Sequence, residues 1–214
     1  MSSSSDMRLL DVGCYIGHDL RALYLAGVPQ TSLFGLDIIG SLPLGHDLFR
    51  DADRFGMTGR FVMGDVLDEG NEAEAARMLD GRMDVVWCSA VLHQFPWDKA
   101  ARACKRLLRY SVGSGAMIIG AIVGTSEKGA AADIRRMSQG RLVGEEPFQH
   151  SAESLERLWT DVGRDLAMHL RVTTAWRPWS SWGCDEERCK YLGPDFGVLE
   201  WTVHVLSPEE TLTT

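Results

Sequence analysis

The stretch Arg8–Leu20, RLLDVGCYIGHDL, contains the pattern that decides the fold. Its apolar run Arg8–Val12 predicts a buried strand, and Gly13 directly after it predicts a tight turn. The segment Asp19–Ala26 has apolar residues at helical spacing, and Gly27 follows it as a typical C-cap. The sequence therefore opens with a strand, a glycine turn and a helix.

The same alternation of strands and helices continues as far as Val123. The predicted strands are Ser32–Leu36, Arg60–Met63, Met83–Cys88 and Ala116–Val123, and the predicted helices are Leu44–Phe55, Asn71–Leu79 and Trp97–Tyr110. Continuously apolar strands indicate a sheet that is buried on both faces. This pattern is typical of a parallel sheet covered by helices.

The pattern changes after Val123. Residues 124–150 are polar and aperiodic, and Ser151–Leu166 predicts an amphipathic helix with Ser151 as its N-cap. Two later strands, Leu170–Trp176 and Val198–Leu206, are joined by a tryptophan-rich loop without a predicted helix, which favours an antiparallel pair.

The predicted fold class is therefore α/β: a Rossmann-like, seven-stranded, mostly parallel sheet with helices on both faces and an antiparallel strand at its end. We expect a disordered leader over residues 1–7, one domain over 8–206 with an insertion at 124–150, and a C-terminal tail over 207–214. The length of 214 residues agrees with one domain.

Composition excludes several classes of partner. The chain has 22 Lys and Arg against 30 Asp and Glu, a net charge of −8, which argues against binding to nucleic acid or to an anionic membrane surface. The sequence predicts neither a signal peptide nor a membrane span. Five widely spaced cysteines without a CxxC pair predict free thiols, no metal site and a cytoplasmic location.

Polar residues follow four predicted strands at their carboxyl ends, where open α/β sheets bind ligands. Asp37 is suited to accept both hydroxyl groups of a ribose, and Asp65 is suited to accept from an adenine amino group. The first turn has only Gly13 and Gly17, with Tyr15 between them, and so departs from the dinucleotide pattern GxGxxG. The fourth position is the segment Ser89–His93 after the fourth predicted strand. Each acid alone suits a cap or a turn, but the four positions together favour a nucleoside site.

These motifs, in this order, resemble those of the class I S-adenosylmethionine-dependent methyltransferases. The motifs are Leu10–Gly17, Gly35–Asp37, Gly64–Val66 and Asp84–Val86. More narrowly, the chain resembles fungal methyltransferases of meroterpenoid secondary metabolism. That resemblance rests on LLDVGCYIGHDLR, on GHDLFRD at Gly45–Asp51, on His93–Phe95 and on FQHSAESLERLW at Phe148–Trp159, and it covers nearly the whole chain.

The resemblance implies S-adenosylmethionine as the cofactor. The residues that would bind it are Asp11, Gly13, Gly17, Asp37, Ile38, Asp65, Val66 and Ser89. Asp11, Gly13 and Gly17 would shape the pocket for the methionine part. Asp37 would hold the ribose, and Ile38 would line one adenine face. Asp65 and Val66 would contact the adenine edge, and Ser89 would lie beneath the sulfonium.

The implied reaction is an SN2 methyl transfer to an oxygen of a small molecule, such as a carboxylate or phenol of a polyketide–terpenoid hybrid. The reaction depends mainly on alignment. His93 and His150 are the candidate catalytic residues, because a neutral imidazole can accept a proton or orient the acceptor oxygen. Packing or helix capping is the alternative role for each.

Two other sets of side chains are candidates for contact with the acceptor. One of Arg135, Arg136 and Arg141 could bind a substrate carboxylate, whereas the alternative is that these arginines are solvated. Trp176, Trp179 and Trp182 could wall an apolar pocket, or could fill gaps where the last strands meet the sheet.

Members of the resembled family usually carry a helical segment before the first motif, whereas seven residues precede Arg8 here. Three expectations follow: an open cofactor site, a homodimer whose partner copy covers the site, or a fold that no longer transfers methyl groups. The leading function is an O-methyltransferase. The alternatives are a methyltransferase-fold cyclase or isomerase of secondary metabolism, and a binding or regulatory subunit.

Overall fold

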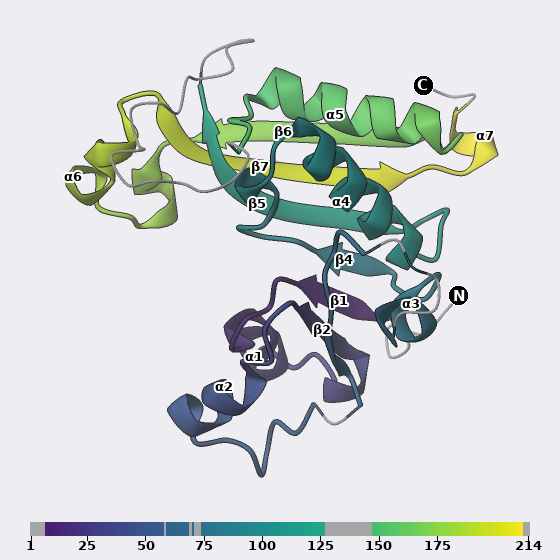
Figure 1. Cartoon of the computed structure of the whole chain (residues 1–214), viewed down its shortest axis with the longest axis vertical. Coiled ribbons are helices and arrows are strands. Elements are labelled where there is room, and N and C mark those ends of the chain that lie inside the picture. Colours follow the sequence, from purple (N-terminus) through teal and green to yellow (C-terminus); the bar gives the residue numbers. More distant parts are fainter. Residues whose placement is uncertain (1–6, 58, 69, 71–73, 127–146, 212–214) are drawn as a thin grey trace. The chain divides into compact units, whose positions relative to one another are not determined.

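The computed structural model describes residues 7–57, 59–68, 70, 74–126 and 147–211. Its strands form a seven-stranded sheet in the order β3-β2-β1-β4-β5-β7-β6 (Figure 1). The strands are β1 (Leu9–Val12), β2 (Leu33–Asp37), β3 (Phe61–Met63), β4 (Val85–Trp87), β5 (Met117–Thr125), β6 (Leu170–Arg177) and β7 (Phe196–Val205). β1 pairs in parallel with β2 and β4, and β2 with β3, whereas β6 and β7 are antiparallel. The predicted Rossmann-like sheet is confirmed.

The helices fall between the strands much as the periodicity predicts. They are α1 (His18–Leu25), α2 (Leu42–Phe49), α3 (Glu74–Leu79), α4 (Trp97–Tyr110), α5 (Ala152–Asp165), α6 (Glu186–Cys189) and α7 (Pro208–Thr211). Short 3-10 turns are η1 (Gln30–Ser32), η2 (Leu92–Gln94), η4 (Trp179–Trp182) and η5 (Lys190–Leu192). The predicted N-cap of α5 is confirmed, because the Ser151 side chain accepts from the Ser154 backbone N–H. The tryptophan-rich loop is partly helical, which the sequence prediction missed.

The helix predicted over Leu44–Phe55 is wrong at both ends. α2 begins earlier, at Leu42, where a proline occupies the first turn. It ends at Phe49 because Arg50 adopts a left-handed conformation with φ 52°. Phe55 is buried from an irregular segment, so the apolar spacing continued beyond the helix itself.

The chain divides into two compact units. One comprises Met1–Cys88 and Arg106–Ile118, and the other comprises Ser89–Lys105 and Ile119–Thr214. Because α4 and β5 run from one unit into the other, this division does not test the single domain predicted over residues 8–206, which stays a prediction. Most of the predicted insertion, including Arg135, Arg136 and Arg141, lies outside the described residues.

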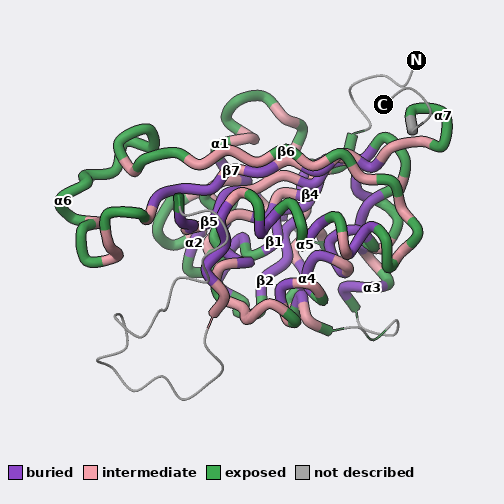
Figure 2. Tube along the Cα trace, turned by 90° about the horizontal axis from the view of Figure 1, so that it is seen from above, coloured by how far each residue is buried: buried purple, intermediate pink, exposed green. Residues whose placement is uncertain are grey.

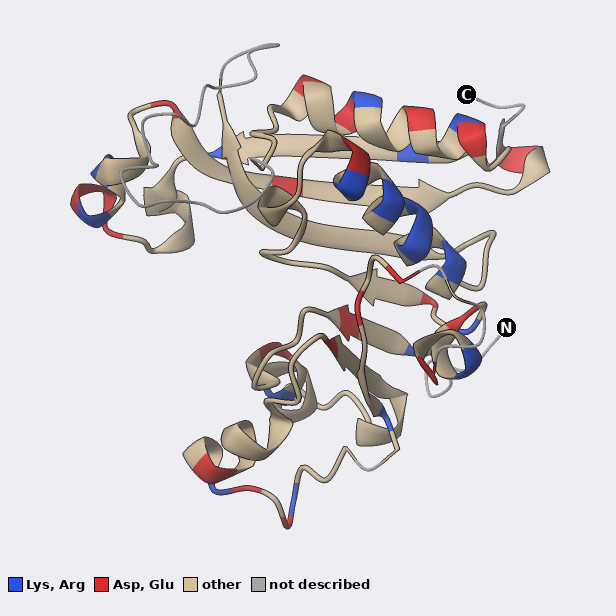
Figure 3. Cartoon of the chain, in the orientation of Figure 1, with Lys and Arg blue, Asp and Glu red and all other residues tan. Residues whose placement is uncertain are grey.

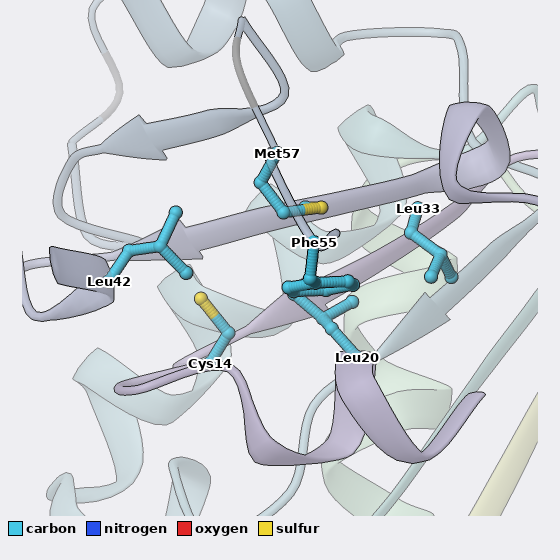
Figure 4. Packing of buried hydrophobic residues seen from close by; sticks show 6 residues of the cluster. All are labelled: Cys14, Leu20, Leu33, Leu42, Phe55 and Met57. Carbon is cyan, nitrogen blue, oxygen red and sulfur yellow. The ribbon is translucent and has the colours of Figure 1, made fainter. Parts of the chain in front are cut away.

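The core of the first unit reaches the glycine turn after β1. Six buried side chains form one cluster: Cys14, Leu20, Leu33, Leu42, Phe55 and Met57 (Figure 4). Cys14 belongs to the turn itself, while the others come from α1, β2, α2 and the segment after α2. The apolar packing of these elements therefore holds the turn in place on its core side. Removing each such side chain from water is favourable by ~1.5–3 kcal/mol.

In the second unit, α5 packs along the antiparallel pair β6–β7. The ring centroids of Trp159 in α5 and Trp201 in β7 lie 5.2 Å apart. An added Cβ at Gly163 would lie 2.9 Å from the Leu170 side chain, so a glycine allows α5 to approach β6 closely. Figure 2 shows β5 and β7 mostly buried, whereas the segment that carries α6 is mostly exposed.

Candidate cofactor and substrate site

The turn between β1 and α1 depends on left-handed backbone. Gly13 and Gly17 have φ 79° and 74°, and Tyr15 between them has φ 47°. The N–H of Gly13 donates to the Leu36 carbonyl at 2.8 Å, which joins the turn to the end of β2. Glycine meets this requirement without strain, whereas Tyr15 adopts a conformation that side chains disfavour. The sequence identified both glycines but did not reveal the strain at Tyr15.

Asp37 connects two loops at the end of β2. Its Oδ2 accepts from the Tyr15 N–H at 2.7 Å, and its Oδ1 accepts from the Ile39 N–H at 2.8 Å. The side chain of Ile38 next to it is 63% exposed. An oriented carboxylate therefore lies beside an uncovered apolar side chain, and each carboxylate oxygen retains capacity for a further hydrogen bond.

Asp65 and Val66 lie close to Asp37 through the backbone. The Gly64 N–H donates to the Asp37 carbonyl at 2.9 Å, so the segment after β3 continues beside the end of β2. Asp65 is exposed and its Oδ1 accepts from the Leu67 N–H at 2.8 Å, while Val66 is buried. The structure thus brings together the predicted residues that follow β1, β2 and β3.

Asp11 is a buried carboxyl group in the first unit, and its pKa is strongly raised. It is 4% exposed, and within the described part of the chain no ion pair reaches its carboxyl group. Burial, together with the nearby Asp19 and Asp37, raises the pKa of Asp11 to about 8. Figure 3 shows acidic residues in β1 and at the end of β2. These carboxyl groups suit a ligand that carries positive charge.

The predicted cofactor matches that requirement. S-adenosylmethionine carries an ammonium and a sulfonium group, so binding would favour the ionised form of Asp11. The left-handed turn and the oriented Asp37 carboxylate suit the methionine part and the ribose, and exposed Ile38 suits the adenine ring. The described residues of this unit therefore fit the cofactor.

A buried arginine, Arg21, binds the carbonyl groups of the glycine turn on its core side. The sequence prediction missed this residue. Arg21 is 5% exposed, and its Nη1 donates to the carbonyls of Ile16 and Gly17 at 2.5 and 3.2 Å. Its Nε and Nη2 donate to both carboxylate oxygens of Asp51 at 2.7 and 3.0 Å. This hydrogen bonding to Arg21 lowers the pKa of Asp51. Arg21 thus neutralises Asp51 and orients two carbonyls of the turn.

One signal in the sequence could have revealed this support. An added Cβ at Gly45 would lie 2.2 Å from the Ile16 carbonyl oxygen and 3.1 Å from Nη1 of Arg21. A glycine inside helix α2 therefore marks the place where that helix meets the turn. The GHDLFRD motif contains both Gly45 and Asp51.

In the second unit, Ser89 begins a turn that is attached to β5. Its Oγ accepts from the Ala121 N–H at 3.3 Å, and the Ala90 N–H donates to the Ala121 carbonyl at 2.8 Å. Ala90 has φ 56°, a left-handed conformation that costs energy for a residue with a Cβ. Strain of this kind concentrates at functional sites.

His93 lies in η2 of the second unit and is partly exposed. Burial lowers the pKa of its imidazole, so the ring is neutral near pH 7. Its Nδ1 is buried, and among the described residues it has no hydrogen-bond partner. A neutral imidazole of this kind can accept a proton.

His150 is fully buried in an aromatic cluster of the second unit. Its ring centroid lies 4.8 Å from that of Phe148 and 5.7 Å from that of Trp97. Its Nδ1 lies 3.3 Å from the Ser154 hydroxyl. Burial and, to a smaller extent, Arg157 lower the pKa of His150 to about 4. The imidazole is therefore neutral and held by α5 and its neighbours.

The predicted residues are thus divided between the units. Those from Asp11 to Val66 belong to the first unit, and Ser89, His93 and His150 belong to the second. All five cysteines are free thiols. Within the ranges that the structure describes, no group of three or more His, Cys, Asp or Glu side chains is placed to bind a metal. Among those same ranges, no helix is long and apolar enough to span a membrane.

The chain is similar over most of its length to fungal methyltransferases. It is 32% identical over 172 residues to the O-methyltransferase phiE of Fungal sp., covering 79% of this chain and 54% of that protein. It is 32% identical over 167 residues to the Asnovolin E/Chermesin D methyltransferase nvfJ of Aspergillus novofumigatus, covering 77% of this chain and 56% of that protein. No family model matches. The chain spans about half the length of the curated relatives that it matches.

The fold is shared with methyltransferases of known structure. Phosphoethanolamine N-methyltransferase 2 of Haemonchus contortus, in complex with S-adenosyl-L-methionine, superposes with a TM-score of 0.66 at 12% identity, covering 94% of this chain and 49% of that one. The [4+2]-cyclase SpnF gives a TM-score of 0.62 at 18% identity, covering 94% of this chain and 75% of that one. The comparisons confirm the resemblance to fungal secondary-metabolite methyltransferases and the methyltransferase fold.

Proposed function

We propose that this chain is the catalytic core of an S-adenosylmethionine-dependent O-methyltransferase of fungal secondary metabolism. One observation carries the proposal: the buried carboxyl group of Asp11, which has no ion pair within the described residues, lies beside a left-handed glycine turn. A site that keeps such a carboxyl group without a protein cation favours a cationic ligand. The similarity to phiE and nvfJ supports the same conclusion.

In the proposed complex, Asp11 binds the ammonium group, and Gly13 and Gly17 leave room for the methionine part. Asp37 accepts hydrogen bonds from the ribose hydroxyls, because its oxygens are already oriented by two backbone N–H groups. The bound cofactor supplies an electrophilic methyl group on a sulfonium.

The adenine ring would lie between apolar and polar contacts. The exposed Ile38 lies against one adenine face, Asp65 accepts from the amino group, and the Val66 N–H donates to a ring nitrogen. Ser89 supports the turn beneath the sulfonium through its bond to β5.

The two histidines take different roles in this proposal. His93 is partly exposed and neutral, so it accepts the proton of a phenol or orients the acceptor oxygen. A carboxylate acceptor is already ionised and needs no base. His150 is fully buried, so it acts as a positioning residue for the segment before α5.

Two further features are part of the proposal. A cytoplasmic location agrees with the five free cysteines. A homodimer agrees with exposed apolar side chains on and near α2, among them Ile39, Leu44 and Leu48. Light scattering coupled to size exclusion tests the dimer: a monomeric mass at micromolar concentration rules it out.

Calorimetric titration with S-adenosylmethionine and with its demethylated product tests the cofactor assignment. We expect saturable binding of both, and Asp37→Ala should weaken each by about tenfold or more. Unchanged binding in Asp37→Ala would contradict the nucleoside site.

Incubation with the methyl-labelled cofactor and a panel of fused-ring carboxylic acids and phenols tests the reaction. Labelled ester or ether is the expected product. His93→Gln should slow transfer to phenols by about a hundredfold and leave transfer to carboxylates nearly unchanged. A product of unchanged mass, formed only with the cofactor bound, would instead support the cyclase or isomerase.

A further inference from the structure

The second unit contains a pocket where β6 ends and β7 begins. Its volume is about 570 Å³, and its walls include the rings of Trp176, Trp179 and Phe196 together with two prolines. Its charged lining residues are Glu186 and Lys190. Pockets of this size with mostly apolar and aromatic walls are typical of sites for small organic molecules.

Close packing keeps one wall of this pocket in place. An added Cβ at Gly197 would lie 2.8 Å from the Trp176 ring and 2.3 Å from the Arg177 carbonyl oxygen. The indole therefore rests directly on the backbone of β7, where only glycine leaves room. A ring held in this way does not need to reorganise before a ligand binds.

The third tryptophan of this region has a different environment. Trp182 is 47% exposed, and its Nε1 donates to Glu200 at 2.8 Å. It does not line the pocket. The three tryptophans proposed from the sequence as wall or filling residues therefore separate into two that line a pocket and one that does not.

The charges of the lining favour a ligand with a neutral body. Lys190 forms an ion pair with Glu187, three residues earlier on the same short helical segment. The lining itself has one acid and one base, so it carries no net charge that would attract an anionic ligand. Aromatic rings and prolines instead favour contact with flat, apolar surface.

Strand β5 connects the pocket with the Ser89–His93 turn, because backbone hydrogen bonds join both regions to this strand or to the residue after it. The Ser126 N–H donates to the Asp195 carbonyl at 2.9 Å, directly beside the lining residues Pro194 and Phe196. The Ala90 N–H donates to the Ala121 carbonyl, five residues earlier in the chain. Five extended residues span about 16 Å, the distance that a ligand bound in the pocket has to cover to reach the turn.

We infer that this pocket binds the apolar, fused-ring body of the methyl acceptor, while the acceptor oxygen points toward the Ser89–His93 turn. The inference rests on the proposed methyltransferase function for the identity of the ligand. It assigns Trp176, Trp179 and Phe196 to acceptor binding. The pocket volume of about 570 Å³ limits the size of the acceptor body that can bind there.

Differential cysteine labelling tests the occupancy of the pocket. Cys189 lines it, whereas the exposed Cys184 does not, and the other three cysteines are buried. Progesterone serves as the probe, because it is a neutral fused-ring ketone. At saturating progesterone, labelling of Cys189 by iodoacetamide should slow by about fivefold, and labelling of Cys184 should not change. Unchanged labelling of Cys189 up to the solubility limit of progesterone overturns the inference.

Two variants of the same segment test which side chains bind. Trp179→Ala should weaken progesterone binding by about tenfold, whereas Trp182→Ala should leave it unchanged. Near-ultraviolet circular dichroism of each variant checks that the segment stays folded. Equal weakening in both variants, or none in Trp179→Ala, overturns the assignment.

Titration with S-adenosylmethionine in parallel separates this inference from the proposed function. If the cofactor binds and Cys189 is not protected, the pocket assignment fails while the methyltransferase proposal stands. If progesterone protects Cys189 and the cofactor does not bind, the pocket stands as a small-molecule site and the methyltransferase proposal fails.

Discussion

The two sides of the glycine turn treat a carboxyl group in opposite ways. On the ligand side, Asp11 has no ion pair within the described residues, and burial raises its pKa to about 8. Behind the turn, Asp51 is held by Arg21 through two hydrogen bonds, which lower its pKa. The paired carboxylate therefore stabilises the turn, whereas the carboxyl group of Asp11 costs stability and is suited to binding.

The largest expected effect is on the paired side. Asp51→Ala should lower the free energy of unfolding by about 3 kcal/mol, because it leaves the buried guanidinium of Arg21 without its anion. Urea denaturation measures this change. Asp53→Ala removes the partner of Arg54 in an exposed pair and should cost less than about 1 kcal/mol. Equal losses in the two variants would mean that the Arg21–Asp51 pair has no special weight.

On the unpaired side, stability and binding should change in opposite directions. Asp11→Asn should weaken the binding of S-adenosylmethionine by about tenfold or more, since the cofactor's ammonium loses its anion. The same change should raise the melting temperature of the free protein at pH 8.5, because a neutral amide avoids the burial of a charge. Titration calorimetry and thermal unfolding measure the two effects. A lower melting temperature would show that the Asp11 carboxylate itself stabilises the fold.

The pH dependence gives a smaller but sharper test. Because the pKa of Asp11 is raised above its ordinary value, this group stabilises the free protein fully below about pH 4, and the contribution is lost as pH rises to about 8. A bound cation favours the carboxylate, so cofactor affinity should increase with pH up to about 8 and binding should release a proton. Calorimetry at pH 7 in two buffers of different ionisation enthalpy measures that proton. In Asp11→Asn, cofactor binding should release no proton from residue 11. If this variant releases as many protons as the unmodified protein, the proton comes from another group.

The smallest expected effect concerns the strained residue between the two glycines. Tyr15→Gly should increase the free energy of unfolding by less than about 1 kcal/mol, because glycine adopts the left-handed conformation without strain. Tyr15→Ala is the matched control, since it removes the ring but keeps the Cβ that causes the strain. A gain in the alanine variant that equals the gain in the glycine variant would attribute the effect to the ring.

The sequence was informative about local features and about their order. Apolar runs and turn glycines predicted the strands of the sheet, and acids at or near the ends of β1, β2 and β3 predicted the residues that the structure brings together in the first unit. The error in α2 arose because Phe55 continues an apolar spacing from outside the helix. Hydrophobic periodicity reports burial, and burial does not require that the helix itself continues.

By itself, the sequence determined the α/β alternation, the glycine turn after the first strand and the carboxyl groups at successive strand ends. Only the tertiary structure decided that Arg21 neutralises Asp51, while Asp11 has no ion pair within the described residues. Arg21 and Asp51 lie thirty residues apart and meet only because α2 folds over the turn, with Gly45 against the Ile16 carbonyl. Backbone preferences act between neighbours in the chain, whereas ion pairing, desolvation and pocket shape depend on groups that folding alone brings together.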